Sequence, residues 1–110
     1  MLAERVAGAL DCAAPRVAGD RTRELHRVAV LPGSGADFTG AAASAGADAL
    51  VTGDLGHHAA REALDRGLSL IDPGHAATER PGLARLRDWV GSLGVETVDL
   101  AGLDPDPWQT

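Results

Sequence analysis

The residues best suited to chemistry are a histidine and a glutamate four positions apart, His75 and Glu79. On an α-helix this spacing places both side chains on one face. Imidazole and carboxylate groups together suit Zn, Fe or Mn better than Ca or Mg. The pair is also compatible with an ordinary helix start, because the helix dipole favours acidic residues there and Thr78 can act as an N-cap. Spacing alone leaves both interpretations open.

Three short apolar runs predict the strands that position these residues. They are bounded by charge or glycine and cover Val28–Leu31, Ala49–Val51 and Leu68–Ile71. A glycine-containing segment with polar side chains follows each run: Ser34 after the first, Asp54 with His57 and His58 after the second, and His75 after the third. Parallel strands end at one rim of a sheet, where ligands bind, so the sequence predicts that these residues converge there.

Two of these segments also have plainer interpretations. Gly33-Ser34-Gly35 could bind a phosphate at a helix N-terminus. However, no Lys completes a P-loop, and Phe38 stands where the dinucleotide fingerprint requires its third glycine. A tight turn is therefore favoured. Adjacent His57 and His58 point to different sides of the chain, so at most one of them is expected to face a shared site, and both could simply lie at a helix start.

Helices are predicted between the strands. Apolar spacing indicates a first helix through Leu2, Val6, Ala9 and Leu10, which Pro15 ends. Others are indicated at Ala36–Ala45, at His57–Arg66 and along a stripe of Leu83, Leu86, Val90 and Leu93. Val95–Leu100 is predicted as a further, more polar strand, and the proline-containing tail Asp104–Trp108 as irregular. The alternation predicts one α/β domain over residues 1–110, with a mostly parallel or mixed sheet of about four to five strands covered by helices.

Composition limits the partners and the compartment. A net charge of −6 and a pI near 5.0 argue against a nucleic-acid backbone as the main partner. The single cysteine, Cys12, cannot form an internal disulfide, which favours a reducing interior and hence the cytoplasm. No apolar stretch reaches the roughly 18 residues that a membrane-spanning helix needs, so no membrane association is expected.

These motifs together resemble the carboxy-terminal half of the Nif-three-like proteins, also named GTP cyclohydrolase 1 type 2 homologues. The matching elements stand in the family's order and spacing: Val28-Ala29-Val30, Gly33-Ser34-Gly35, Ala45-Gly46-Ala47-Asp48, Val51-Thr52-Gly53-Asp54 with His58, Gly74-His75 with Thr78-Glu79-Arg80-Pro81, and the tail Asp104–Trp108. The resemblance covers nearly the whole chain, and Gly-His-x-x-Thr-Glu is its most specific element.

The resemblance implies a toroidal homohexamer in which each subunit holds a dinuclear centre of divalent metals. It makes His75 and Glu79 metal ligands. Asp54, His58 and Ser34 are expected beside those ligands or against a substrate. Self-association is accordingly expected.

The chain departs from the family pattern in its metal ligands. The family's remaining ligands, a His-His pair and an Asp, belong to an amino-terminal half that is expected to be absent here. His57-His58 is not that pair, because it lies in the Thr-Gly-Asp element. Two functions remain open. One is a metal-dependent hydrolase acting on a nucleotide-like or other substrate and completed by a separate amino-terminal half. The other is a non-catalytic module for oligomerisation or partner binding.

Overall fold

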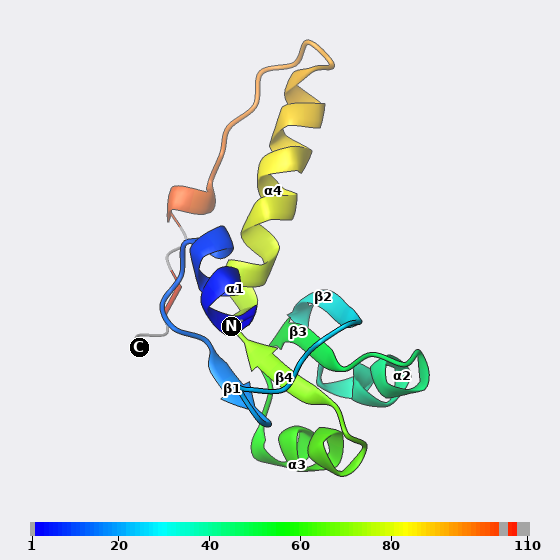
Figure 1. Ribbon diagram of the computed structural model, residues 1–110. Helices are drawn as coiled ribbons and strands as arrows, with labels where there is room; N and C mark the ends of the chain where they lie inside the picture. The colour runs from blue at the N-terminus through cyan, green and yellow to red at the C-terminus, as the bar shows by residue number, and fades with distance from the viewer. Residues whose placement is uncertain (1, 104–105, 108–110) are drawn as a thin grey trace.

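A four-stranded mixed sheet forms the centre of the fold (Figure 1). The computed structural model describes residues 2–103 and 106–107. The strands are β1 (Arg16–Ala18), β2 (Val28–Ser34), β3 (Ala49–Gly53) and β4 (Ser69–Asp72), in the spatial order β1-β4-β3-β2. Strands β2, β3 and β4 are parallel, whereas β1 is antiparallel to β4. The predicted mixed α/β sheet is therefore confirmed.

Helices cover both faces of this sheet. They are α1 (Leu2–Leu10), α2 (Thr39–Ser44), α3 (His57–Asp65) and α4 (His75–Gly91), with short 3-10 turns at Ala36–Phe38 and Ala101–Leu103. Helices α2 and α3 lie on one face, and α1 with the start of α4 lies on the other (Figure 1). The predicted helix Ala36–Ala45 is thus divided into a 3-10 turn and a shorter α-helix.

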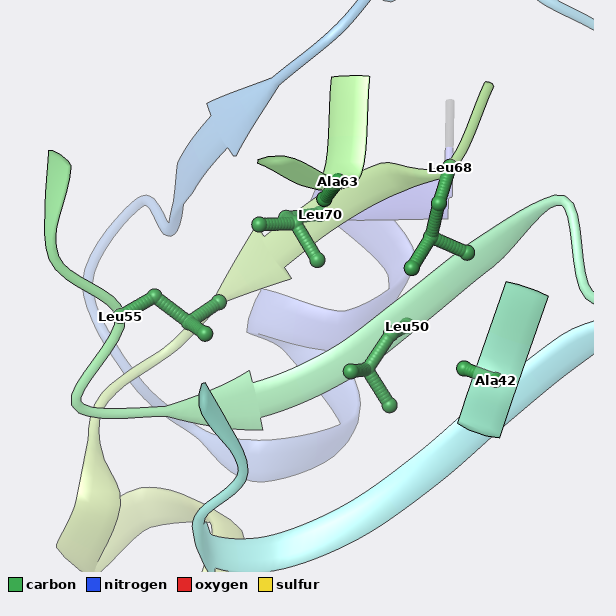
Figure 2. Close-up of a cluster of buried hydrophobic side chains, with 6 residues drawn as sticks. All are labelled: Ala42, Leu50, Leu55, Ala63, Leu68 and Leu70. Atoms are coloured by element: carbon green, nitrogen blue, oxygen red, sulfur yellow. The ribbon is translucent and has the colours of Figure 1, made fainter. Parts of the chain in front are cut away.

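The alternation of side chains along β3 and β4 divides the core into two layers. Leu50 and Leu70 face α2 and α3, where they pack in the cluster of Ala42, Leu50, Leu55, Ala63, Leu68 and Leu70 (Figure 2). Val51 and Ile71 face the opposite way and pack against Ala3 of α1. Every residue of β3 and β4 is buried, as expected for central parallel strands with helices on both faces.

Strand β2 is less buried than its apolar sequence predicts. It is an edge strand, and only its inward residues Ala29 and Leu31 pack against the core. Val30 on the other face is 73% exposed. The prediction of a buried strand over Val28–Leu31 is therefore wrong, because no helix among the described residues covers Val30 on this face.

The region after α4 contains the second correction. Residues Val95–Leu100 form no strand; they run back along α4 as an extended segment without secondary structure (Figure 1). The predicted apolar stripe is helical through Val90, but Leu83, Leu86 and Leu93 are exposed rather than packed. The sequence therefore predicts packing against these leucines that the described residues do not provide.

The remaining expectations concern the ends of the chain and the membrane. Cys12 lies just beyond α1 and is half-buried. Asp106 and Pro107 are irregular, whereas Asp104, Pro105 and Trp108 lie outside the described residues. Among the helices that the structure describes, none combines the length and apolarity needed to cross a membrane.

Candidate functional site

The carboxyl ends of β3 and β4 bring Asp54, His75 and Glu79 together. The Nδ1 atom of His75 lies 2.6 Å from Oδ2 of Asp54, and its Nε2 atom lies 2.9 Å from Oε1 of Glu79. All three side chains are about half exposed. The residues after β3 and β4 therefore meet at one edge of the sheet, as the sequence predicts.

Asp54 reaches His75 through an unusual backbone conformation. Its φ of 56° lies in the left-handed region, which short polar residues such as Asp tolerate better than most others. Gly53, just before it, passes very close to the start of α4. A Cβ at Gly53 would lie 2.6 Å from the backbone N of His75 and from the carbonyl oxygen of Gly33. Only glycine fits at this close approach.

Asp72 forms hydrogen bonds with the loop that contains Asp54 and with the loop that leads into His75. Its Oδ1 accepts a hydrogen bond from the N–H of Gly74 at 2.9 Å, and its Oδ2 accepts one from the N–H of Leu55 at 3.1 Å. Arg16 donates to the same Oδ2 at 2.6 Å and to the carbonyl oxygen of Leu55 at 2.8 Å. The buried Asp72 carboxylate thus binds the residue next to Asp54 and the residue next to His75.

Thr78 joins the start of α4 to the turn at the end of β2. Its Oγ1 accepts a hydrogen bond from the N–H of Gly33 at 2.8 Å and donates one to the carbonyl oxygen of His75 at 2.7 Å. The N–H of Gly33 is therefore already bonded within the protein, which agrees with the tight-turn interpretation over a phosphate loop. Thr78 is not the N-cap, which is Gly74.

The electrostatics of the site raise the pKa of the His75 imidazole. The hydrogen bond to Asp54 raises the pKa of His75 above its ordinary value of 6.5, and the charges of Glu79 and Asp54 act in the same direction. Partial desolvation of the ring opposes this shift. His75 is thus held between two carboxylates, one on each ring nitrogen.

Among the described residues, no side-chain hydrogen bond or ion pair joins the other predicted site residues to this group. His57 and His58 are exposed at the start of α3, where their rings make an edge-to-face contact with centroids 5.5 Å apart. Ser34 is exposed at the end of β2, and no hydrogen bond of its side chain is found among the described residues. Asp54 alone of the three predicted neighbours contacts a predicted ligand.

The donor pair fits a divalent metal ion, although it is an incomplete ligand set. Nε2 of His75 and Oε1 of Glu79 are 2.9 Å apart, close enough to bind one ion at ordinary metal–ligand distances. A Cβ at Gly33 would lie 3.4 Å from Nε2 and 3.3 Å from Oε2 of Glu79, so the absence of a side chain there leaves space beside both donors. Across residues 2–103 and 106–107, no three His, Cys, Asp or Glu side chains group as a metal site.

A cleft of about 640 Å³ opens beside the site. His75, Asp54 and Asp72 line one part of it, and the segment after α1, including Cys12, lines another. The sequence places Asp72 at the predicted rim, at the end of the third apolar run, but it indicates no role for Asp72 and no part for Arg16. The signal for Asp72 was its place at the end of a strand before Pro-Gly, where an Asp side chain commonly bonds the N–H two residues later.

Comparisons with known proteins agree on one family. The model of the Duf34/NIF3 (NGG1p interacting factor 3) family matches residues 1–102. A GTP cyclohydrolase 1 type 2 homolog from Nostoc sp. is 48% identical over 87 residues, which are 79% of this chain and 33% of that protein.

Solved structures agree with the sequence match. A Bacillus cereus protein related to NIF3 has a TM-score of 0.78 and 31% identity, covering 98% of this chain and 31% of that chain. The Staphylococcus aureus protein SA1388 has a TM-score of 0.75 and 27% identity, covering 98% of this chain and 36% of that chain. This chain spans about a third of the length of these relatives.

Proposed function

This chain belongs to the Duf34/NIF3 family, and we propose that it supplies His75 and Glu79 as ligands to a divalent metal site for a hydrolytic reaction. The observation that carries the proposal is the convergence of Nε2 and Oε1 at 2.9 Å while Asp54 holds the opposite ring nitrogen. A metal-bound histidine commonly donates its other N–H to a carboxylate, which fixes the tautomer and the ring orientation. Asp54 is placed to do this for His75.

Each residue of the site has a defined task in this proposal. A bound divalent ion would polarise a carbonyl group or make a water molecule more acidic, which is the usual contribution of such ions to hydrolysis. Asp54 keeps the proton on Nδ1, so that Nε2 presents its lone pair. Thr78 and Asp72 hold the backbone on either side of His75. The cleft beside His75 is the space in which a substrate would bind.

The remaining ligands must come from outside the described residues. Two protein donors leave most positions around an ion to water, so the chain alone is expected to bind metal weakly. A second copy of the chain or another polypeptide could supply the missing donors. The nucleotide-like substrate class is proposed only because the relatives are named as homologues of a GTP cyclohydrolase.

A metal titration with matched variants tests the proposal. The chain is titrated with Zn²⁺ and with Mn²⁺ by calorimetry, and the imidazole signals are followed by NMR. We expect binding that perturbs the ring of His75 and weakens at least about tenfold in His75→Ala and in Glu79→Ala, since each change removes one of two donors. His58→Ala, an exposed histidine away from the pair, is the control and should bind as the unmodified chain does. Equal binding by all four proteins would contradict the proposal.

A second candidate function is partner binding without catalysis, which the exposed apolar surface of α4 favours. Activity measurements distinguish the two. The hydrolase proposal requires metal-dependent turnover by the fully assembled site, which a binding module would lack under the same conditions.

A further inference from the structure

A pocket of about 270 Å³ lies between α1, β1 and the segment that joins β1 to β2. On the sheet it is lined by Val28 and Ser69, the first residues of β2 and β4, whereas the candidate metal site follows the last residues of β3 and β4. None of the described residues that line this pocket also lines the cleft beside His75. The pocket is therefore separate from the candidate metal site.

The floor of this pocket is apolar. Val17 and Ile71 are cross-strand partners on β1 and β4, and both belong to the hydrophobic cluster that includes Ala3 of α1. Val28 lines the same pocket and is 38% exposed although its side chain is apolar. The apolar floor, defined as Val17, Val28 and Ile71, thus offers a surface on which an apolar ligand group would be removed from water.

Three arginines surround the apolar floor. They are Arg5 of α1 and Arg21 and Arg23 of the segment between β1 and β2. A chain with ten basic residues and a net charge of −6 therefore places three of its cations around one pocket. The one acidic side chain among the described lining residues is Asp20, whose Oδ1 already accepts hydrogen bonds from the N–H and the hydroxyl of Thr22 at 2.8 and 2.6 Å. The charge around the pocket favours an anion.

The three arginines differ in their contacts with the rest of the chain. Arg23 donates hydrogen bonds to the carbonyl oxygens of Gly67 at 2.6 Å and Asp48 at 3.1 Å, so its guanidinium group is held at the pocket. No hydrogen bond or ion pair of the Arg5 or Arg21 side chain is found within residues 2–103 and 106–107. Guanidinium groups bind carboxylate and phosphate oxygens through paired hydrogen bonds, and both of these arginines are available to do so.

A buried hydroxyl group also lines the pocket. Ser69 is 7% exposed, and its Oγ has no hydrogen-bond partner in the part of the chain that the structure describes. A Cβ at Gly19 would lie 2.6 Å from this oxygen, so only glycine can stand beside it. A buried hydroxyl without a partner costs stability unless water or a ligand bonds to it. Ser69 therefore indicates a polar group bound next to the apolar floor.

We propose that this pocket binds a small amphipathic anion. An apolar group of the ligand packs on the apolar floor, its carboxylate or phosphate binds Arg5 and Arg21, and Ser69 donates a hydrogen bond to it. The volume lies just below the usual range for ligand pockets, so the ligand is smaller than a dinucleotide. The proposal depends neither on metal binding nor on hydrolysis.

A titration with four small probes tests the proposal. The full chain is kept in a chelator at constant ionic strength, and its amide NMR signals are followed during addition of each probe. Phenyl phosphate and benzoate carry both an apolar ring and an anionic group. Benzyl alcohol carries only the ring, and inorganic phosphate carries only the charge.

We expect one or both of the amphipathic anions to bind with a Kd on the order of 1 mM, which is within reach of ligands of this size. The binding should be at least about tenfold tighter than that of either control probe and should shift the signals of Ser69 and Ile71. The tighter of the two anions shows whether the pocket prefers carboxylate or phosphate. The proposal is overturned if neither anion binds more tightly than both control probes.

Two charge-matched variants locate the binding site. Arg5→Gln combined with Arg21→Gln should weaken binding of the tighter anion at least about tenfold, because both free guanidinium groups are lost. Arg61→Gln combined with Arg85→Gln removes the same charge from exposed positions on α3 and α4 and should bind as the unmodified chain does. Circular dichroism shows that both variants are folded. Equal weakening in the two variants, or signal shifts confined to the cleft beside His75, would overturn the proposal.

Discussion

The apolar side chains of strands β3 and β4 are buried, whereas most of those on helix α4 are exposed. Both strands are buried along their whole length, because helices cover the two faces of the sheet at this point. In α4, the one residue that is fully buried is Ala77 in its first turn, and the leucines farther along remain exposed. The difference shows that an apolar pattern predicts the need for cover, whereas the topology decides whether this chain provides it.

The candidate site lies at the boundary between these two regions. His75 and Glu79 stand in the first turns of α4, where the helix still contacts β2 and β3. The packed region fixes the geometry of the pair through Asp72 and Gly53. The uncovered region leaves the same helix face open to a partner.

The largest expected effect is the difference in stability between a substitution in the packed strands and one on the exposed part of α4. Leu70→Ala should lower the free energy of unfolding by about 2–5 kcal/mol, because it leaves a cavity in the packed core. Leu86→Ala should change it by less than about 0.5 kcal/mol, because its side chain is half exposed. Urea denaturation followed by circular dichroism measures both. Similar losses for the two variants would mean that α4 is covered in solution, for example by self-association.

A glycine pair tests how tightly the site is built. Gly53→Ala should destabilise the chain by about 1–3 kcal/mol, since its Cβ would collide with the carbonyl oxygen of Gly33 and the backbone of His75. Gly82→Ala in α4 meets nothing within 4 Å and should instead stabilise the chain by up to about 1 kcal/mol through helix propensity. Thermal unfolding shows whether each substitution lowers or raises the stability of the chain. A neutral Gly53→Ala would contradict the close approach of β3 to α4.

Much of the fold could be predicted from the sequence. The three parallel strands, the mixed sheet and the family resemblance are confirmed, because continuous apolar runs and glycine-bounded helices are local signals. Exposure of Val30 and the missing strand at Val95–Leu100 could not be predicted in this way. Both depend on which neighbour is present in space, and hydrophobic patterns do not specify a neighbour.

The site was predictable in part. The spacing of His75 and Glu79 placed both on one helix face, and their meeting with Asp54 followed from parallel strand ends. His58 was expected nearby, but helix α3 begins at His57 and leaves both histidines exposed. The role of Asp72 depends on long-range hydrogen bonds to Leu55 and Arg16, which no local pattern reveals.

Removal of the Asp72 carboxylate tests whether the packed region positions the site. Asp72→Ala leaves the N–H of Leu55 buried without its acceptor, which should cost about 1–3 kcal/mol of unfolding free energy. The NMR signal of the His75 ring should also shift, because Gly74 loses its hydrogen bond. Asp37→Ala, at an exposed aspartate, should do neither. A destabilised variant with an unchanged His75 signal would show that Asp72 supports the fold without positioning the histidine.

The smallest expected effect is a pH dependence at Asp48, in the turn just before β3. Asp48 accepts hydrogen bonds from the N–H groups of Arg27 and His26, at 2.9 and 2.8 Å, and these bonds lower its pKa below the ordinary value of 3.8. A carboxylate with a lowered pKa stabilises the folded state above pH 3.8, and this contribution is lost as the pH falls through the lowered pKa.

Asp48→Asn should therefore be less stable than the unmodified chain at pH 6, and the difference should shrink as the pH falls below 3.8. The effect should be modest because the carboxylate is close to solvent. Urea midpoints measured from pH 6 to pH 3 give the comparison. Equal stability of the two proteins at pH 6 would mean that the two N–H groups bind the Asn amide oxygen as well as the carboxylate, so that the turn before β2 is held by geometry rather than by charge.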